Sequence, residues 1–238
     1  MRTRQLIPAL LTAGLLLSGC SGSSDASGGS DGGGGDAAAD PSARLADAKK
    51  SLDSAETITI SLATKSLPDG ITGLLSAKGT GNHSPAFKGK VTVVTGGASL
   101  GADVIATGGK VYAKTGFLPD FTAIDPASLK APDPASLLST DAGITRILVE
   151  TDDVTEDGQS RDGKDVLTTI KGTLGGDVVK TIIPSADADG TFAATYRLDD
   201  DDTLRDVTLA GPFYPGGAAV TYTVTLATSD TPVTIDAP

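Results

Sequence analysis

Apolar and polar residues alternate along many short segments of this chain, which is the pattern of strands with one buried face. In residues 57–65, for example, Ile58, Ile60 and Leu62 alternate with threonine and serine. The same alternation, with Gly-Asn and Gly-Gly turn signals between several segments, predicts further strands at 74–80, 87–95, 100–107, 110–114, 149–156, 166–171, 191–198, 204–210 and 219–227. Because most connections are short turns, we expect an antiparallel sheet.

Helical spacing follows Asp40-Pro41, which is typical of an N-cap with proline at the first helical position. Apolar residues then recur at helical intervals, at Leu45, Ala48, Leu52 and Ala55. Residues 175–183 predict a second, short helix that ends at Pro184.

The segment Asp-Pro-Ala-Ser-Leu occurs twice, at Asp125 and Asp133, and each copy is typical of a helix start. The second copy predicts a helix that continues to Leu148, interrupted or kinked near Gly143. The order is then helix, strands, helix, strands, helix, strands. This order predicts one α+β domain with an antiparallel sheet and helices gathered on one of its faces.

The N-terminus has the layout of an export signal: Arg2 and Arg4, then an apolar run over residues 6–17. The run is shorter than the roughly 20 residues that a spanning helix needs. It ends at Leu17-Ser18-Gly19-Cys20, which resembles the bacterial lipobox and contains the only cysteine. We therefore expect residues 1–19 to be a cleaved signal peptide and Cys20 to be acylated and membrane-anchored; a secretory peptide with a chance cysteine is the alternative. Residues 20–39 are then the acylated cysteine with a flexible Gly/Ser/Asp tether, and residues 40–238 the folded domain.

The net charge of the chain limits the classes of partner that it is expected to bind. The formal net charge is −11, and removal of Arg2 and Arg4 with the signal peptide makes it −13. Such a chain is not expected to bind nucleic acid. Net charge of this sign also predicts repulsion from an anionic membrane, so that close approach to lipid would depend on the tether and on apolar contacts.

Candidate catalytic and metal-binding residues are few. His83 is the only histidine, and its setting in Gly-Asn-His-Ser-Pro predicts a solvated turn rather than a catalytic base. One histidine and one acylated cysteine cannot form a site of His and Cys ligands. Asp199 to Asp202, with Asp206 beyond, lacks the ligand spacing of a calcium loop, and it predicts a charged hairpin turn. We expect no enzyme, no metal and no cofactor.

Several stretches together resemble the LppX, LprA, LprF and LprG family of actinobacterial lipoproteins. In order, they are residues 89–93, 109–113, 133–138, 140–144, 158–165, 178–184, 224–226 and 232–235. The resemblance implies a strongly curved antiparallel sheet, a half barrel, with helices on its concave face enclosing a large apolar cavity. It also implies a carrier of multi-acyl lipids or glycolipids across the cell envelope, and it adds a lipid efflux transporter as a candidate partner.

The residues expected to line that cavity are apolar strand positions, with Val91 the best single candidate by the resemblance. They are Ile58, Ile60, Leu62, Val91, Val93, Val104, Val111, Tyr222, Val224 and Leu226. From alternation alone, a packed core is the favoured interpretation of these positions, and the family resemblance reverses that preference. Relatives tend to have a Trp-Gly pair where this chain has Thr228-Ser229, so the resemblance does not identify the lipid. An accessory lipoprotein that presents a surface, for example to a sensor kinase, or an adhesin without a cavity are the alternatives.

Overall fold

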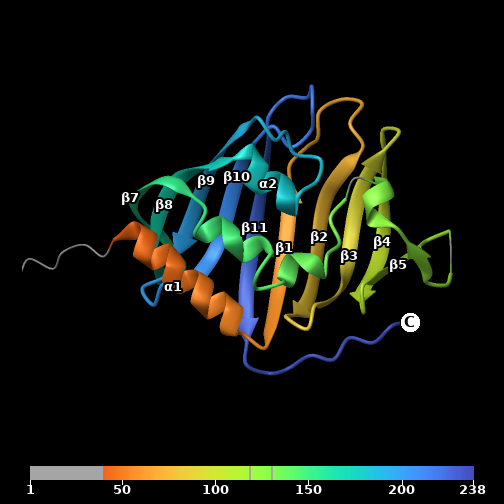
Figure 1. The fold of residues 1–238 in the computed structure, drawn as a ribbon, viewed down its shortest axis with the longest axis horizontal. Coiled ribbons are helices and arrows are strands. Elements are labelled where there is room, and N and C mark those ends of the chain that lie inside the picture. The colour runs from red at the N-terminus through yellow and green to blue at the C-terminus, as the bar shows by residue number, and fades with distance from the viewer. Residues whose placement is uncertain (1–39, 118, 130) are drawn as a thin grey trace, which may run out of the picture. The chain divides into compact units, whose positions relative to one another are not determined.

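The computed structural model describes residues 40–117, 119–129 and 131–238, and these form an open, eleven-stranded antiparallel sheet with helices on one face (Figure 1). The predicted signal peptide and tether, including Cys20, lie outside the described residues. The strand order is β6-β5-β4-β3-β2-β1-β11-β10-β9-β8-β7. The α+β class and the curved, half-barrel sheet expected from the sequence are confirmed.

The elements have the following bounds. The strands are β1 (Thr57–Thr64), β2 (Gly73–Asn82), β3 (Ala86–Thr95), β4 (Ala98–Thr107), β5 (Lys110–Thr115), β6 (Thr122–Ile124), β7 (Asp152–Asp162), β8 (Asp165–Gly175), β9 (Thr191–Leu198), β10 (Leu204–Gly211) and β11 (Val220–Ser229). The helices are α1 (Pro41–Ser54) and α2 (Gly176–Ile182), with the 3-10 helices η1 (Pro126–Leu129), η2 (Ser136–Leu138) and η3 (Ile144–Leu148).

Two meanders make up the sheet, one from β1 to β6 and one from β7 to β11. They are joined where β1 pairs with β11, with Ile60 opposite Leu226 and Leu62 opposite Val224. This pairing brings together segments that are more than 150 residues apart in the sequence. It leaves β6 and β7 as the two edges of the sheet.

The first helix forms as its sequence predicts. An Oδ1 of Asp40 accepts a hydrogen bond from the backbone N–H of Ser42, Pro41 begins the helix, and Leu45, Ala48 and Leu52 are its buried residues. Figure 1 shows α1 and α2 over the β7 to β11 half of the sheet, where α1 contacts η3 and β7, and α2 contacts β8 and β9.

The prediction of an α-helix after Asp133 is wrong, although the chain is interrupted at Gly143 as predicted. The chain forms two short 3-10 helices there, η2 and η3, because Asp133 caps its own turn by accepting from the N–H of Ala135, and the chain turns sharply at Gly143. A Cβ atom at Gly143 would lie 2.2 Å from the carbonyl oxygen of Ser139, so the turn admits only glycine. The buried side chains of Leu138 and Ile147 still face the sheet, which explains why the apolar spacing resembled that of one helix.

The core lies between the helices and the sheet. Tyr196, Phe192 and Phe213 are among its largest fully buried side chains. The ring of Phe213 packs edge-on against those of Phe192 and Tyr222, with centroids 4.8 and 4.9 Å apart. No helix within residues 40–117, 119–129 and 131–238 has the length and apolar character needed to cross a membrane.

Candidate functional site

The register of the sheet brings all ten predicted cavity residues to one face. Directly opposed residues in antiparallel strands point to the same side, and residues two apart on a strand do so as well. Six of the ten are buried, namely Ile58, Ile60, Val104, Val111, Tyr222 and Val224, and four are half-buried, namely Leu62, Val91, Val93 and Leu226. Their contact with lipid stays a prediction.

The half-buried apolar residues of β1 to β4 form two rows, which we call the apolar strip. The first row is Leu62, Ala77, Val91 and Ala102, and the second is Leu74, Val93 and Leu100. All seven are half-buried, whereas most residues on the same face of β8 to β11 are buried, where the helices cover them. The strip is therefore an apolar surface that the fold leaves partly exposed.

Four members of the strip were not among the residues singled out from the sequence: Leu74, Ala77, Leu100 and Ala102. On β2 the alternation is interrupted by a register shift between Leu74 and Ser76, which hides the pattern in that segment. The pairing of these residues with Val91 and Val93 identifies them. Sequence alternation alone does not specify such cross-strand partners.

Small residues shape the strip. The cross-strand neighbours of Val91 are Ala77 and Ala102, whose side chains are shorter, so the Val91 side chain protrudes above them. Farther along the same face, Gly79 and Gly89 lie beneath the ring of Phe87, and a Cβ at Gly79 would come within 2.4 Å of that ring. The buried Phe87 thus closes one end of the strip.

Two tyrosine hydroxyls stand at the other end, beside the covered half of the sheet. The N–H of Leu74 donates to Tyr214 (3.2 Å), the hydroxyls of Tyr214 and Tyr222 are 2.8 Å apart, and Tyr222 donates to the carbonyl oxygen of Leu74 (2.5 Å). Burial, followed by the hydrogen bond with Tyr214, raises the pKa of Tyr222 above its ordinary value, so its hydroxyl remains a donor. These bonds hold the bulged end of β2 against β11.

A pocket lies between the sheet and the helices α1, η2 and η3, which we call the helical cover. Its volume is about 10 Å³, which is room for about one water molecule. Its lining is mostly apolar: Leu52, Ile58, His83, Leu137, Leu138, Ile144, Thr145, Ile147, Leu148, Leu204, Val207 and Leu226. In this conformation the pocket cannot hold an acyl chain, so a chain could enter only if the cover moved away from the sheet.

His83 is not the solvated residue that its sequence context predicted. It lies in the turn between β2 and β3, but its ring lines the pocket, with Nδ1 2.6 Å from the carbonyl oxygen of Leu138 and Nε2 3.0 Å from that of Leu52. A neutral imidazole has one N–H and can donate to only one of these oxygens. The residue thus links the turn to both α1 and η2.

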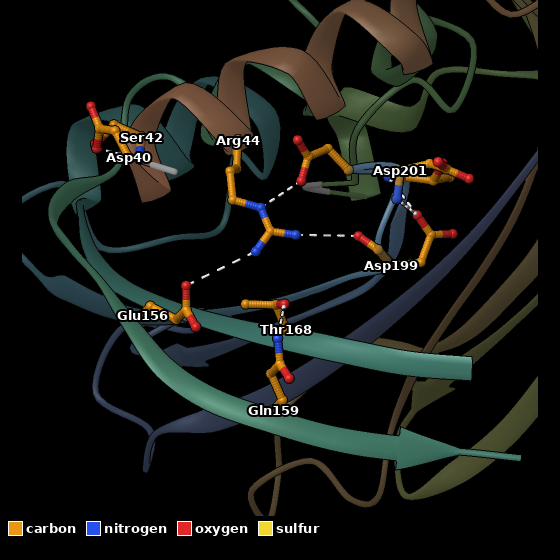
Figure 2. A network of polar contacts seen from close by, with 10 residues as sticks. Asp40, Ser42, Arg44, Glu156, Gln159, Thr168, Asp199 and Asp201 are labelled. Carbon is orange, nitrogen blue, oxygen red and sulfur yellow. Dashed lines mark hydrogen bonds and ion pairs between the residues drawn. The ribbon is translucent and has the colours of Figure 1, made fainter. Parts of the chain in front are cut away.

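Arg44 fastens α1 to the sheet (Figure 2). Its Nε lies 2.5 Å from Oδ1 of Asp202, one terminal nitrogen donates to the carbonyl oxygen of Asp199 (3.2 Å), and the other lies 4.0 Å from Glu156 of β7. The side chain of Arg44 is 12% exposed. Residues 199–202 form the predicted hairpin turn, in which Asp199 accepts from the N–H groups of Asp201 and Thr203. Residues 199–202 thus stabilise their own turn, and through Arg44 they also hold α1 against the sheet.

An open depression of about 610 Å³ lies beside β5 and β6, and it mixes polar and apolar side chains, among them Lys110, Tyr112, Ile124 and Asp125. Within the described part of the chain, no three His, Cys, Asp or Glu side chains are placed to hold a metal ion.

Residues 40–235 match the LppX_LprAFG lipoprotein family, and the chain belongs to that family. A relative named lipoarabinomannan carrier protein LprG, from Mycolicibacterium smegmatis, is 25% identical over 206 residues, which are 84% of this chain and 82% of the relative. Crystal structures of LprF from Mycobacterium bovis and of LppX from Mycobacterium tuberculosis share the fold. Their TM-scores are 0.65 and 0.59, each at 18% identity, and they cover 83% and 82% of this chain and 96% and 98% of their own.

Proposed function

We propose that this protein is an exported lipoprotein, acylated at Cys20, that binds multi-acyl lipids or glycolipids on the concave face of its sheet and carries them across the cell envelope. No bond is made or broken in this role. Membership of a lipoprotein family and the name of the LprG relative support the proposal. The observation that carries it is the apolar strip, because a soluble domain gains nothing by leaving such a surface half-exposed unless something apolar covers it.

The physical need for a carrier follows from the hydrophobic effect. A lipid with three acyl chains has on the order of forty methylenes, each contributing about 0.8 kcal/mol to its preference for an apolar environment. Such a molecule cannot leave a bilayer through water at a useful rate. An apolar surface within the protein replaces the bilayer, and since both environments are apolar, the net binding free energy can be small enough to permit release.

Loading would begin on the strip and extend beneath the cover. The strip is already accessible, whereas the pocket below α1, η2 and η3 is too small for an acyl chain. The contacts of Arg44 and His83 hold that cover in place, and both are polar contacts at its margin, outside the apolar rows. We therefore infer that loaded protein differs from the present conformation by displacement of the cover from the sheet.

The test is native mass spectrometry with lipid extraction on the mature chain expressed in a related actinobacterium. The decisive variant is Val91→Trp, whose indole would lie over Ala77 and Ala102 and fill the strip. The matched control is Thr92→Trp, the next residue on β3, which points to the opposite face. We expect lipid on the parent and on the control, and none on Val91→Trp, with all three folded by circular dichroism.

Equal lipid on both tryptophan variants would refute the assignment of the strip. A lipid-free mass for the parent, repeated after incubation with envelope lipids, would refute the carrier role. It would favour the alternative of an accessory lipoprotein that presents a surface, for example to a sensor kinase. A lipid efflux transporter as the source or recipient of cargo stays a prediction.

A further inference from the structure

Positive charge is concentrated on the convex face of one half of the sheet, in a chain that is acidic overall. Residues 73–117, which contain β2 to β5, have five lysines and one aspartate, a formal charge of +4. Residues 152–238, which contain β7 to β11, have 16 acidic and 6 basic residues, a formal charge of −10. The protein is thus strongly polarised between the two halves of its sheet.

The register explains why these lysines gather. Lys78, Lys90 and Lys114 lie in one row across β2 to β5, with Asp103 of β4 between the last two. Lys88 and Lys110 point to the same side, because each is an odd number of positions from a residue of the opposite, apolar face. We call these five residues the lysine face. It is the reverse side of the strands that form the apolar strip.

Acidic neighbours neutralise the lysine face only in part, and Asp125 and Asp133 line the same open depression as Lys110. Asp103 pairs with Lys90 at 2.5 Å, and Lys114 lies over the ring of Phe121, 5.7 Å from its centroid. Lys78, Lys88 and Lys110 are exposed, and the Lys90 side chain is 80% exposed. Asp236, next to Ile235 in the C-terminal segment that packs on Ala86 and Ile105, is a further acidic residue near this face. Lys78 stands directly opposite Lys90, an arrangement of like charges that weakens strand pairing and that an anionic partner would relieve.

We propose that the lysine face docks on the anionic headgroup surface of the membrane. Lysine is a hydrated point charge suited to phosphate groups at a fluid surface. Protein interfaces, by contrast, are enriched in aromatic residues and arginine and depleted in lysine, and the lysine face contains no arginine. Four strands spaced about 4.8 Å apart spread the row over about 15 Å, so several lysines can reach one surface together.

Docking would bring the carrier's binding surface close to its source of lipid. The apolar strip lies one sheet thickness away, so its open rim would lie within about 10 Å of the headgroups. The inference deepens the proposed function by naming the surface that approaches the membrane. It also changes what net charge predicts, because the repulsion expected of a mature chain with a charge of −13 is confined to the acidic half.

The test is vesicle flotation of the mature chain, residues 20–238, made with Cys20→Ser so that no lipid anchor masks the contact. Vesicles are phosphatidylcholine alone, or with about 30% phosphatidylglycerol to supply the anionic surface. We expect binding only to the anionic vesicles. It should be strong in about 50 mM NaCl and lost in about 500 mM NaCl, because the higher salt concentration screens the attraction between lysines and headgroups.

Two quadruple variants that change the net charge equally test whether the lysine face is the surface that binds the vesicles. The first is Lys78→Gln, Lys88→Gln, Lys90→Gln and Lys110→Gln; the control is Lys50→Gln, Lys164→Gln, Lys171→Gln and Lys180→Gln, all exposed lysines of other surfaces. Each lysine at the surface contributes about fivefold to partitioning, so we expect the first variant to bind more than about tenfold more weakly and the control to bind as the parent does.

Equal loss in both variants, or binding that salt does not weaken, would overturn the proposal. Salt-sensitive self-association in sedimentation velocity, abolished by the first variant, would overturn it in favour of a second copy of the chain as the partner. The first variant should still co-purify with lipid, because its substitutions are on the reverse face. A parent chain that binds anionic vesicles but carries no lipid cargo would instead refute the carrier role alone.

Discussion

Replacement of Arg44 by methionine should loosen the helical cover while keeping the apolar stem of the side chain. Arg44 makes a short charged contact with Asp202, a hydrogen bond to the carbonyl of Asp199, and a longer ion pair with Glu156. A hydrogen bond to a charged group contributes about 1.5–3 kcal/mol when buried. The carboxylates of Asp202 and Glu156 are 29% and 35% exposed and would be rehydrated in the variant, so the full cost of stranding a buried charge does not apply.

We therefore expect Arg44→Met to lower the free energy of unfolding by about 2 kcal/mol, and the melting temperature by about 4–8 °C for a domain of this size. Urea denaturation followed by circular dichroism measures the change. Arg205→Met is the matched control, since Arg205 pairs with Asp165 at 2.6 Å but is 43% exposed. Its effect should stay below about 0.5 kcal/mol.

The same variant tests whether the cover must move for lipid to enter. If it must, Arg44→Met should take up a fluorescent acyl lipid faster than the parent, because the closed conformation is less favoured. A loss of stability under about 0.5 kcal/mol would show that Arg44 does not fasten the cover. Normal destabilisation with an unchanged rate of uptake would contradict the requirement for cover movement.

Three further predictions follow from single sites. Gly79→Ala should lower the urea midpoint, because its Cβ would lie 2.4 Å from a buried phenylalanine ring, whereas Gly101→Ala has no atom within 4 Å and should be tolerated. The hydrogen bond from Lys90 holds the pKa of Asp103 below its ordinary value. The ionised Asp103 therefore favours folding above a pH of about 4, and this contribution is lost as the pH falls through the lowered pKa. Lys90→Gln should raise the pKa of Asp103, which an NMR titration measures. Burial raises the pKa of Tyr196 to about 12, so stability should be lost as the pH rises from about 10, and Tyr196→Phe should reduce this loss in urea melts across that range.

Much of the fold could be predicted from the sequence because its signals are local. The pleat of a strand has a period of two, so Ile58, Ile60 and Leu62 had to share a face wherever that strand lay. Asp40-Pro41 provided the cap and the first residue of α1 within a few positions. The acidic run at residues 199–202 formed a turn for the same reason, because aspartate side chains bond to nearby backbone N–H groups.

Predictions from local sequence patterns were wrong where more than one local structure is compatible with the same pattern. After Asp133 the apolar spacing fits one helix or two short 3-10 turns, and tight contacts at Gly143 decided between them. His83 lies in a turn, as expected, but its ring contacts the carbonyl oxygens of Leu52 and Leu138, which are far along the chain.

The sequence by itself determined that the chain alternates like a sheet, begins its fold with a capped helix, contains one cysteine in a lipobox-like setting, and is acidic. Only the tertiary structure decided that β1 pairs with β11, that the helices cover one half of the sheet, and that Val91 stands among Ala77, Ala102 and Leu62 on the half left open. The same pairing collected five lysines, scattered over 37 positions from Lys78 to Lys114, onto one face. The reason is that alternation specifies the side to which a residue points, whereas register between strands specifies the residues that stand beside it.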